Sequence, residues 1–298
     1  LENSAFYRSI KLTTINLPDS ISFMGANVLG ETAIKHLTVP AGMKTCSFNS
    51  FGSMKELLTA DFKGYNFTTL NNNSFYGCVS LKKVTLPPSI VEIKTNTFNR
   101  CDSLEEVLFD VYPDNYPTAA KRGKSDLKTL WPISNGLPYL KTFGLKTHAT
   151  GENPQNVLPD GLTMIRDQVF NKCSALETMV IPATTEYIGY YAFNATGLKS
   201  IEFKTYADGA NAGKSSLTTI GFSAFADTKL TSFVFPESTN TSGITIGTAI
   251  FKGSYLLNKV TYSKSVKLTP NELINGARNV KEIVIPEGLS FVRKGDML

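Results

Sequence analysis

The chain has 298 residues, of which 42% are hydrophobic and 18% charged, and its formal net charge is +5. This composition can bury a continuous core, while the charge is too small to indicate nucleic-acid binding. No stretch approaches 18 uninterrupted apolar residues, so we expect no membrane insertion. There is no signal peptide, and because the chain begins at Leu1 without methionine we interpret it as a fragment whose targeting segment has been removed.

One short unit recurs along the chain, with an apolar anchor, a second apolar residue six positions later and a third after three more. In chain order the triplets are Phe6/Leu12/Ile15, Val28/Ile34/Leu37, Phe48/Met54/Leu57, Phe75/Leu81/Val84, Phe98/Leu104/Val107, Ile133/Leu140/Phe143, Phe170/Leu176/Met179, Phe193/Leu198/Ile201, Phe225/Leu230/Phe233, Phe251/Leu257/Val260 and Ile274/Val280/Ile283. Three of them depart from the spacing by one residue. The anchors Phe75, Phe98, Phe170, Phe193, Phe225 and Phe251 are predicted to be buried and stacked in one column.

Two stretches of each unit alternate apolar and polar residues as β-strands do. One runs Leu-x-x-Val-x-Leu-Pro, as from Leu81 to Pro87, and its proline ends the strand because it cannot donate to a ladder. The other precedes the next anchor, as from Ile90 to Ile93, and glycines follow it where the chain must turn: Gly25, Gly189, Gly221 and Gly247. Between the anchor and the first strand, an apolar spacing of three suits one short helical turn.

The longer units carry their extra residues at one point, after the first strand. These insertions are Asp110 to Asp126, Lys146 to Asp160, Lys204 to Ser216 and Glu237 to Gly243. Insertions at an equivalent point emerge along one edge of a solenoid, and variable loops on a rigid scaffold often bind ligands. The predicted ligand-contact residues are therefore Tyr112, Tyr116, Trp131, His148 and Tyr206. The alternative is tolerated insertion, because lengthening a loop costs little free energy.

The pattern resembles the BspA-like leucine-rich repeats of bacterial and protist surface proteins. The best-matching unit runs from Ile181-Pro182 through Ile188-Gly189 and Ala192-Phe193 to Leu198 and Ile201. The resemblance covers the chain from about Phe6 to Phe291 and departs around Phe109 to Leu162, where the Ala-Phe pair is missing. It implies a cell-surface or secreted location, adhesion or ligand binding with an extracellular protein or glycan as partner, and no shared catalytic residues.

A segment that resembles a phosphate loop, Gly209-Ala-Asn-Ala-Gly-Lys-Ser215, is one residue short of that motif. A phosphate cradle also needs the amides of a following helix, whereas Leu217 to Ile220 has the pattern of a strand. His36 and His148 are the only histidines and lie in different coils, with no Gly-x-Ser-x-Gly segment. We therefore expect no cofactor, no metal and no catalytic residues.

Three of the four cysteines, Cys78, Cys101 and Cys173, share the position three residues after the anchor, where another coil has Phe51. Exchange with phenylalanine indicates a core position. Side chains in register point the same way, whereas a disulfide needs Cβ atoms that face each other, so we favour buried thiols over disulfides.

Outward positions of a solenoid form rows. The residue after each strand-opening apolar residue is lysine in six coils: Lys35, Lys55, Lys82, Lys141, Lys199 and Lys281. This row favours acidic partners such as sulfated glycans, and the alternative is ordinary strand composition.

The predicted fold is a repeat solenoid, a right-handed leucine-rich-repeat superhelix with parallel β-sheets and short helical turns. We expect residues 1–298 to form a single domain of about eleven coils, longer and irregular at about 109–162 and 203–217. The favoured function is a surface-exposed or secreted ligand-binding or adhesion module without catalytic activity. The alternative is a structural spacer that displays other domains. A binder should concentrate its exposed aromatic residues, whereas a spacer should scatter them.

Overall fold

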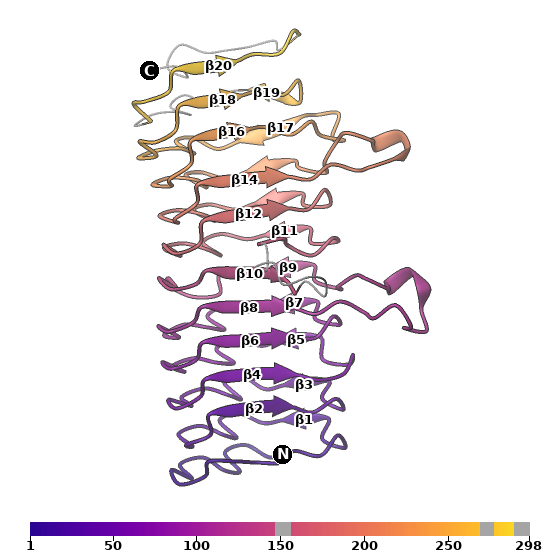
Figure 1. The fold of residues 1–298 in the computed structure, drawn as a ribbon, viewed down its shortest axis with the longest axis vertical. Coiled ribbons are helices and arrows are strands. Elements are labelled where there is room, and N and C mark those ends of the chain that lie inside the picture. Colours follow the sequence, from indigo (N-terminus) through magenta and orange to yellow (C-terminus); the bar gives the residue numbers. More distant parts are fainter. Residues whose placement is uncertain (147–155, 269–276, 289–298) are drawn as a thin grey trace. The chain divides into compact units, whose positions relative to one another are not determined.

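The computed structural model describes residues 1–146, 156–268 and 277–288. The chain divides into two compact units, Leu1–Gln155 and Asn156–Leu298. In each unit the chain winds as a β-solenoid with parallel sheets and almost no helix, and the two units together contain about eleven turns (Figure 1). The predicted fold class is therefore confirmed. No helix among the described residues is long and apolar enough to cross a membrane.

The first unit has a sheet of longer strands and a row of two-residue strands. The longer strands are β2 (His36–Val39), β4 (Thr59–Phe62), β6 (Lys83–Leu86), β8 (Glu106–Phe109) and β10 (Thr142–Leu145), hydrogen-bonded in that order. The short strands are β1 (Phe23–Met24), β3 (Thr45–Cys46), β5 (Thr69–Leu70), β7 (Glu92–Ile93) and β9 (Thr129–Leu130). Every strand pair in this unit is parallel, as successive coils of a solenoid require.

The second unit repeats this plan. Its longer strands are β12 (Thr178–Ile181), β14 (Ser200–Phe203), β16 (Ser232–Val234), β18 (Lys259–Thr261) and β20 (Glu282–Val284). The strands of its other row are β11 (Met164–Ile165), β13 (Tyr187–Ile188) and β15 (Thr219–Ile220), of two residues each, and β17 (Ile244–Ile246) and β19 (Val266–Leu268), of three residues each. The only helices in the described part of the chain are two three-residue 3₁₀ turns, η1 (Ala119–Lys121) and η2 (Gly209–Asn211), both inside insertions.

The predicted phenylalanine column exists in each unit. All six anchors are fully buried. In the first unit Phe75 stacks on Phe98 with ring centroids 5.8 Å apart. In the second unit Phe193 stacks on Phe170 at 5.1 Å and on Phe225 at 5.3 Å. A buried aromatic ring removes a large apolar area from water, and the offset stacking adds a favourable ring–ring contact.

The predicted anchor of the third coil, Phe48, is wrong. Its side chain is 53% exposed, whereas Phe51, three residues later, is fully buried and stacks on Phe75 with centroids 5.1 Å apart. The strand partners agree, because Ala60 lies between Leu37 and Val84 in the register, in place of the predicted Leu57. Two residues after Ala60 on the same strand, the Phe62 ring contacts both Phe51 and Phe75 edge-on.

The predicted helical turn around the anchor is instead a turn with two residues of positive φ. In one coil these are Asn73 (φ 59°) and Gly77 (φ 75°). Around other anchors, two residues of positive φ likewise lie four positions apart, as Asn96 and Arg100 do. Asparagine is among the residues that adopt this conformation most readily. The backbone N–H groups then point along the stack: the Phe75 amide donates to Thr97 O of the next coil at 2.9 Å.

All four cysteines are buried free thiols, as predicted. The Cys78 thiol donates to Phe51 O and the Cys101 thiol to Phe75 O, each at 3.1 Å. Burial raises the pKa of Cys78 to about 12 and the pKa of Cys101 well above its usual value.

We therefore predict that Cys78 and Cys101 do not react with a thiol reagent such as iodoacetamide in the native protein at neutral pH. The reactive species is the thiolate, and burial suppresses both its formation and its access. Mass spectrometry after labelling, with and without urea, checks this. Rapid native labelling of either residue would contradict the buried position.

Candidate functional site

The first insertion forms a projecting loop with a hydrogen-bonded stem. It follows β8, and in the stem the Tyr112 amide donates to Lys124 O at 2.9 Å while the Gly123 amide donates to Tyr112 O at 2.7 Å. The loop then enters β9, and η1 lies near its tip (Figure 1). The stem fixes the direction of a loop whose residues are otherwise largely exposed.

The insertion between β14 and β15 in the second unit has the same stem. There the Tyr206 amide donates to Lys214 O at 2.8 Å, and the Gly213 amide donates to Tyr206 O at 2.9 Å. The two segments share sequence as well: Gly123-Lys124-Ser125-x-Leu127-x-Thr129 matches Gly213-Lys214-Ser215-x-Leu217-x-Thr219. The chain thus uses one stem design twice, with different tips.

This shared stem also explains the segment that resembles a phosphate loop. The amides of Gly213 and Lys214 donate within the loop, to Tyr206 O and Asn211 O. They are not presented to a ligand, and β15 follows in place of a helix. The Gly-Lys-Ser sequence therefore builds a loop stem and no phosphate cradle.

Tyr112 anchors the first loop from inside. Its side chain is buried, and its hydroxyl donates to Asp126 Oδ2 at 2.6 Å. Lys121 Nζ forms an ion pair with the same carboxylate oxygen at 2.7 Å. Burial raises the pKa of Tyr112 to about 12, and the hydrogen bond to Asp126 acts in the same direction. The corresponding hydroxyl of Tyr206 lies 2.8 Å from Ser216 Oγ.

Three tyrosines meet at the base of the first loop. Tyr116 packs on Tyr112 with centroids 4.4 Å apart, and Tyr65, from the turn after β4, contacts Tyr116 at 5.2 Å and Tyr112 at 5.7 Å. Tyr65 is 43% exposed, so it presents the accessible ring of this tyrosine cluster. Sequence reasoning missed Tyr65, although Gly64-Tyr65 lies after a strand like the other insertions, because the misplaced anchor Phe48 shifted that coil by three residues.

The other predicted contact residues lie elsewhere. Trp131 follows β9, and its ring N–H donates to the Glu92 carboxylate on β7. Tyr206 belongs to the second unit. His148 lies outside the described residues. The structure therefore brings together Tyr112 and Tyr116 from the predicted set and adds Tyr65 to them.

A second group of exposed aromatic residues lies in the second unit. Tyr190 and Tyr191 follow β13, Phe222 follows β15, and the Tyr191 and Phe222 rings are 5.3 Å apart. Nearby, the Tyr187 hydroxyl donates to Asp167 Oδ1 at 3.2 Å. Burial and the Asp167 charge together raise the pKa of Tyr187 to about 12.

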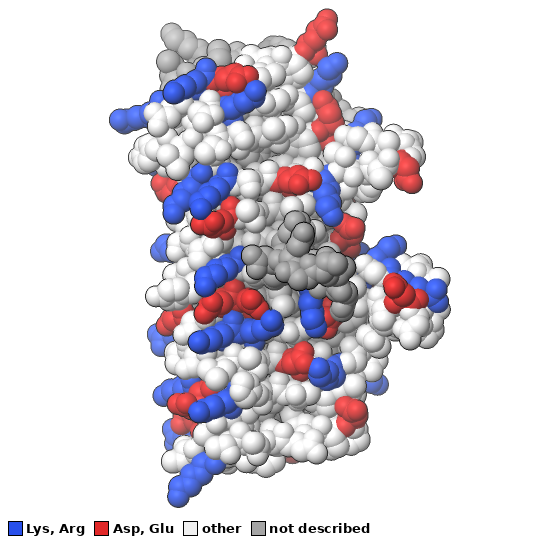
Figure 2. All heavy atoms as spheres, in the orientation of Figure 1, with Lys and Arg blue, Asp and Glu red and all other residues white. Residues whose placement is uncertain are grey.

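The predicted lysine row is neutralised in part by its own neighbours. Lys141 pairs with Glu105 at 2.9 Å and Lys199 with Glu177 at 2.7 Å, and Lys55 is outside the row because Leu58 takes its place. Figure 2 shows Lys and Arg side chains interleaved with Asp and Glu side chains. Exposed pairs of this kind stabilise a protein little, but they reduce the local positive potential that an acidic partner would meet.

Stacked parallel coils, an anchor column and projecting loops define a leucine-rich-repeat solenoid. The chain belongs to the BspA-type leucine-rich repeat family, whose model matches six copies over residues 1–110, 152–212 and 211–295. This confirms the resemblance seen in the sequence.

One solved structure shows the same fold. A leucine-rich repeat protein from Bacteroides ovatus is 22% identical with a TM-score of 0.51, and the match covers 87% of this chain and 62% of that one. The chain thus spans less than two thirds of that protein. A leucine-rich cell surface protein from Faecalibacterium prausnitzii is 22% identical (95% and 82% covered, TM-score 0.43), and the leucine-rich repeat protein of T. pallidum is 15% identical (79% and 82% covered, TM-score 0.48). No curated protein matches the chain.

Proposed function

We propose that this chain is a ligand-binding or adhesion module, exposed at a cell surface or secreted, that acts without catalysis. Membership of a family of surface-protein repeats supports the location. The observation that carries the binding role is the tyrosine cluster of Tyr65, Tyr112 and Tyr116, in which an accessible ring is held rigidly beside a projecting loop. Rigid aromatic residues provide contact area at low cost in conformational entropy.

The alternative is a structural spacer that displays other domains. The chain could serve that role whether it forms one domain or two units. A spacer has no need for gathered aromatic side chains at its surface. In this chain the exposed Tyr190, Tyr191 and Phe222 gather in one unit, and in the other the exposed Tyr65 packs against the half-buried Tyr116. This grouping favours a binder.

We predict that the 298-residue chain binds at least one member of an array of extracellular matrix proteins and glycans. The double variant Tyr65→Ala/Tyr116→Ala should weaken that binding about tenfold or more, because central aromatic contacts commonly contribute at least about 2 kcal/mol to an interface. Replacing residues 113–122 by a short turn, with the stem kept, should do the same. Surface plasmon resonance measures each affinity.

Tyr139→Ala is the matched control, because Tyr139 is exposed and lies outside both aromatic groups. Circular dichroism checks that every variant folds. Wild-type affinity in the folded double variant would remove the tyrosine cluster from the binding site. An array without any bound member would favour the spacer, and turnover of a substrate that a single side-chain substitution abolishes would contradict the absence of catalysis.

A further inference from the structure

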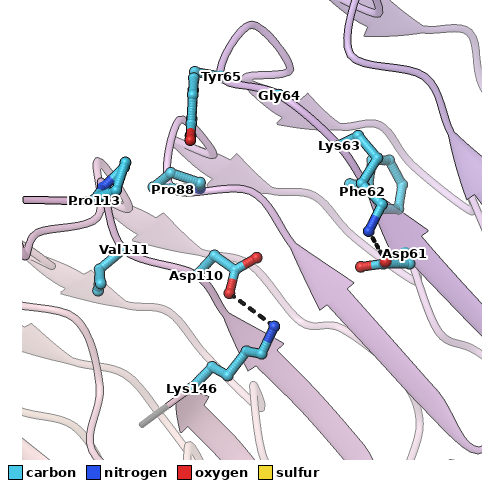
Figure 3. A pocket seen from close by; sticks show the side chains of 10 residues that line it. All are labelled: Asp61, Phe62, Lys63, Gly64, Tyr65, Pro88, Asp110, Val111, Pro113 and Lys146. Atoms are coloured by element: carbon cyan, nitrogen blue, oxygen red, sulfur yellow. Dashed lines mark hydrogen bonds and ion pairs between the residues drawn. The ribbon is translucent and has the colours of Figure 1, made fainter. Parts of the chain in front are cut away.

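A hollow of about 270 Å³ lies next to the tyrosine cluster in the first unit (Figure 3). It is open at the carboxyl ends of β4, β6, β8 and β10, where the chain leaves each strand. Its lining comprises Asp61, Phe62, Lys63, Gly64, Tyr65, Pro88, Asp110, Val111, Pro113 and Lys146. Its volume is close to the lower end of small-molecule sites, about 300 Å³, so it suits one small chemical unit and no long chain.

The charges of the hollow balance. Asp61 forms an ion pair with Lys63, and Asp110 forms one with Lys146 at 3.3 Å. A purely anionic or cationic ligand therefore meets no net opposite charge, and it would have to displace one member of a pair. A neutral ligand with several hydroxyl groups has no such cost, because each pair places a carboxylate acceptor beside an ammonium donor.

Asp110 is the least satisfied of these groups. Its side chain is mostly buried, and its Oδ1 atom has no hydrogen-bond donor among the described residues, although Lys146 Nζ lies within ion-pair distance. Because Oδ1 is buried beside Lys146, a ligand in the hollow would meet the other oxygen of this carboxylate. Figure 3 shows this second oxygen of Asp110 turned away from Lys146, toward the side of Asp61 and Lys63, while the Tyr65 hydroxyl points toward Pro88 from the other side.

The remaining walls are flat and apolar. Pro88 and Pro113 stand on the same side of the hollow as Tyr65 (Figure 3). The contacts with Tyr112 and Tyr116 hold the Tyr65 ring in place. Flat apolar surfaces match the C–H face of a sugar ring, while the paired charges match its hydroxyl groups.

Resting on the proposed binding function, we propose that this hollow binds a neutral sugar unit of a glycan. Such a ligand fits the three features together: a small volume, balanced donors and acceptors, and an immobilised aromatic ring. The proposal assigns Tyr65 as the packing surface and Asp110 as the principal hydroxyl acceptor.

The test is titration of the 298-residue chain with methyl glycosides of neutral hexoses and N-acetylhexosamines, followed by saturation-transfer NMR. We expect at least one glycoside to bind with a Kd of about 1 mM, since a ligand this small makes few contacts. Its affinity should change less than about twofold between roughly 0.05 and 0.5 M salt, because a neutral ligand is not screened. Tyr65→Ala and Asp110→Asn should each weaken binding about tenfold.

Tyr139→Ala and Tyr206→Ala are the controls and should leave the affinity unchanged. Failure of every neutral glycoside to bind overturns the proposal. So does binding confined to sulfated or uronic sugars with strong salt dependence, which would assign an anionic ligand. If a protein ligand from the array depends on Tyr65 and Tyr116 while no glycoside binds, the proposed binding function stands and the sugar assignment alone fails.

Discussion

Phe51→Ala should lower the free energy of unfolding by about 3–5 kcal/mol, the usual loss when an aromatic side chain is deleted from a core. Phe51 is fully buried, stacks on Phe75 and contacts Phe62 edge-on. The substitution therefore removes both the burial of the ring and the support of two neighbouring rings. Because coils of a repeat protein stabilise their nearest neighbours, the coil that contains Phe75 should also loosen.

Phe48→Ala is the matched control. It removes the same kind of side chain, but from a position three residues before Phe51 that is 53% exposed. Its effect should stay within about 0.5 kcal/mol. Urea unfolding followed by circular dichroism compares the two variants, and amide hydrogen exchange reports whether protection falls in the neighbouring coils. A larger loss for Phe48→Ala than for Phe51→Ala would restore Phe48 as the anchor.

This pair of residues also shows where the sequence pattern is ambiguous. Ser47-Phe48-Asn49-Ser50-Phe51 offers two anchors three positions apart, and both are followed by apolar residues at acceptable spacing. The choice depends on Ala60, whose small side chain is a poor match to the pattern, although Phe62 on the same strand contacts the Phe51 and Phe75 rings. The place of Ala60 between Leu37 and Val84 is visible only once the strand register is known.

The phenylalanine anchors of the other coils were predictable because each of these coils buries an aromatic side chain at the same position of the repeat. Phe98 and Phe193, for example, stand at the same place in their units and are buried in the same way. The ion pairs were not predictable. Lys141 meets Glu105 across an insertion, since the two residues are 36 positions apart in sequence and adjacent in the sheet.

The candidate site was predicted in part. The insertion indicates Tyr112 and Tyr116, but sequence spacing does not reveal that the Tyr112 side chain is buried and bonded to Asp126. Comparing the insertions with each other would have exposed the shared stem, because Gly123-Lys124-Ser125 recurs as Gly213-Lys214-Ser215. The place of Tyr65 in the cluster is seen only from its ring contacts with Tyr112 and Tyr116.

The glycines after the short strands of the second unit have a different physical reason from the predicted turn. Gly189, Gly221 and Gly247 do not have positive φ. Instead, a Cβ atom at Gly221 would lie 2.6 Å from the carbonyl carbon of Gly189, and one at Gly247 would lie 2.6 Å from the carbonyl carbon of Gly221. Each glycine thus allows the backbone of the neighbouring coil to approach.

Gly221→Ala should therefore destabilise the protein by about 3 kcal/mol or more, at or beyond the upper end of ordinary overpacking. Two of the three colliding atoms, the Gly189 carbonyl carbon and the Tyr190 nitrogen, belong to backbone. Rotation of the Tyr190 side chain, which supplies the third, therefore does not relieve the contact, and the two coils must separate. The Gly221 amide donates to Ile188 O at 2.7 Å, and this hydrogen bond should lengthen as they do. The shift should also disturb the exposed aromatic group, because Tyr190 is attached to the backbone that would move.

Gly213→Ala separates this collision from the general cost of replacing glycine. Gly213 has a φ of +76° and open space around its missing Cβ, so its replacement should cost only the left-handed penalty, roughly 1–2 kcal/mol. Urea unfolding of both variants measures the difference, and the environment of Tyr190 can be followed by aromatic NMR signals. A loss for Gly221→Ala no larger than that for Gly213→Ala would mean that the coils can separate at little cost. Close approach would then not be the reason for glycine at this position.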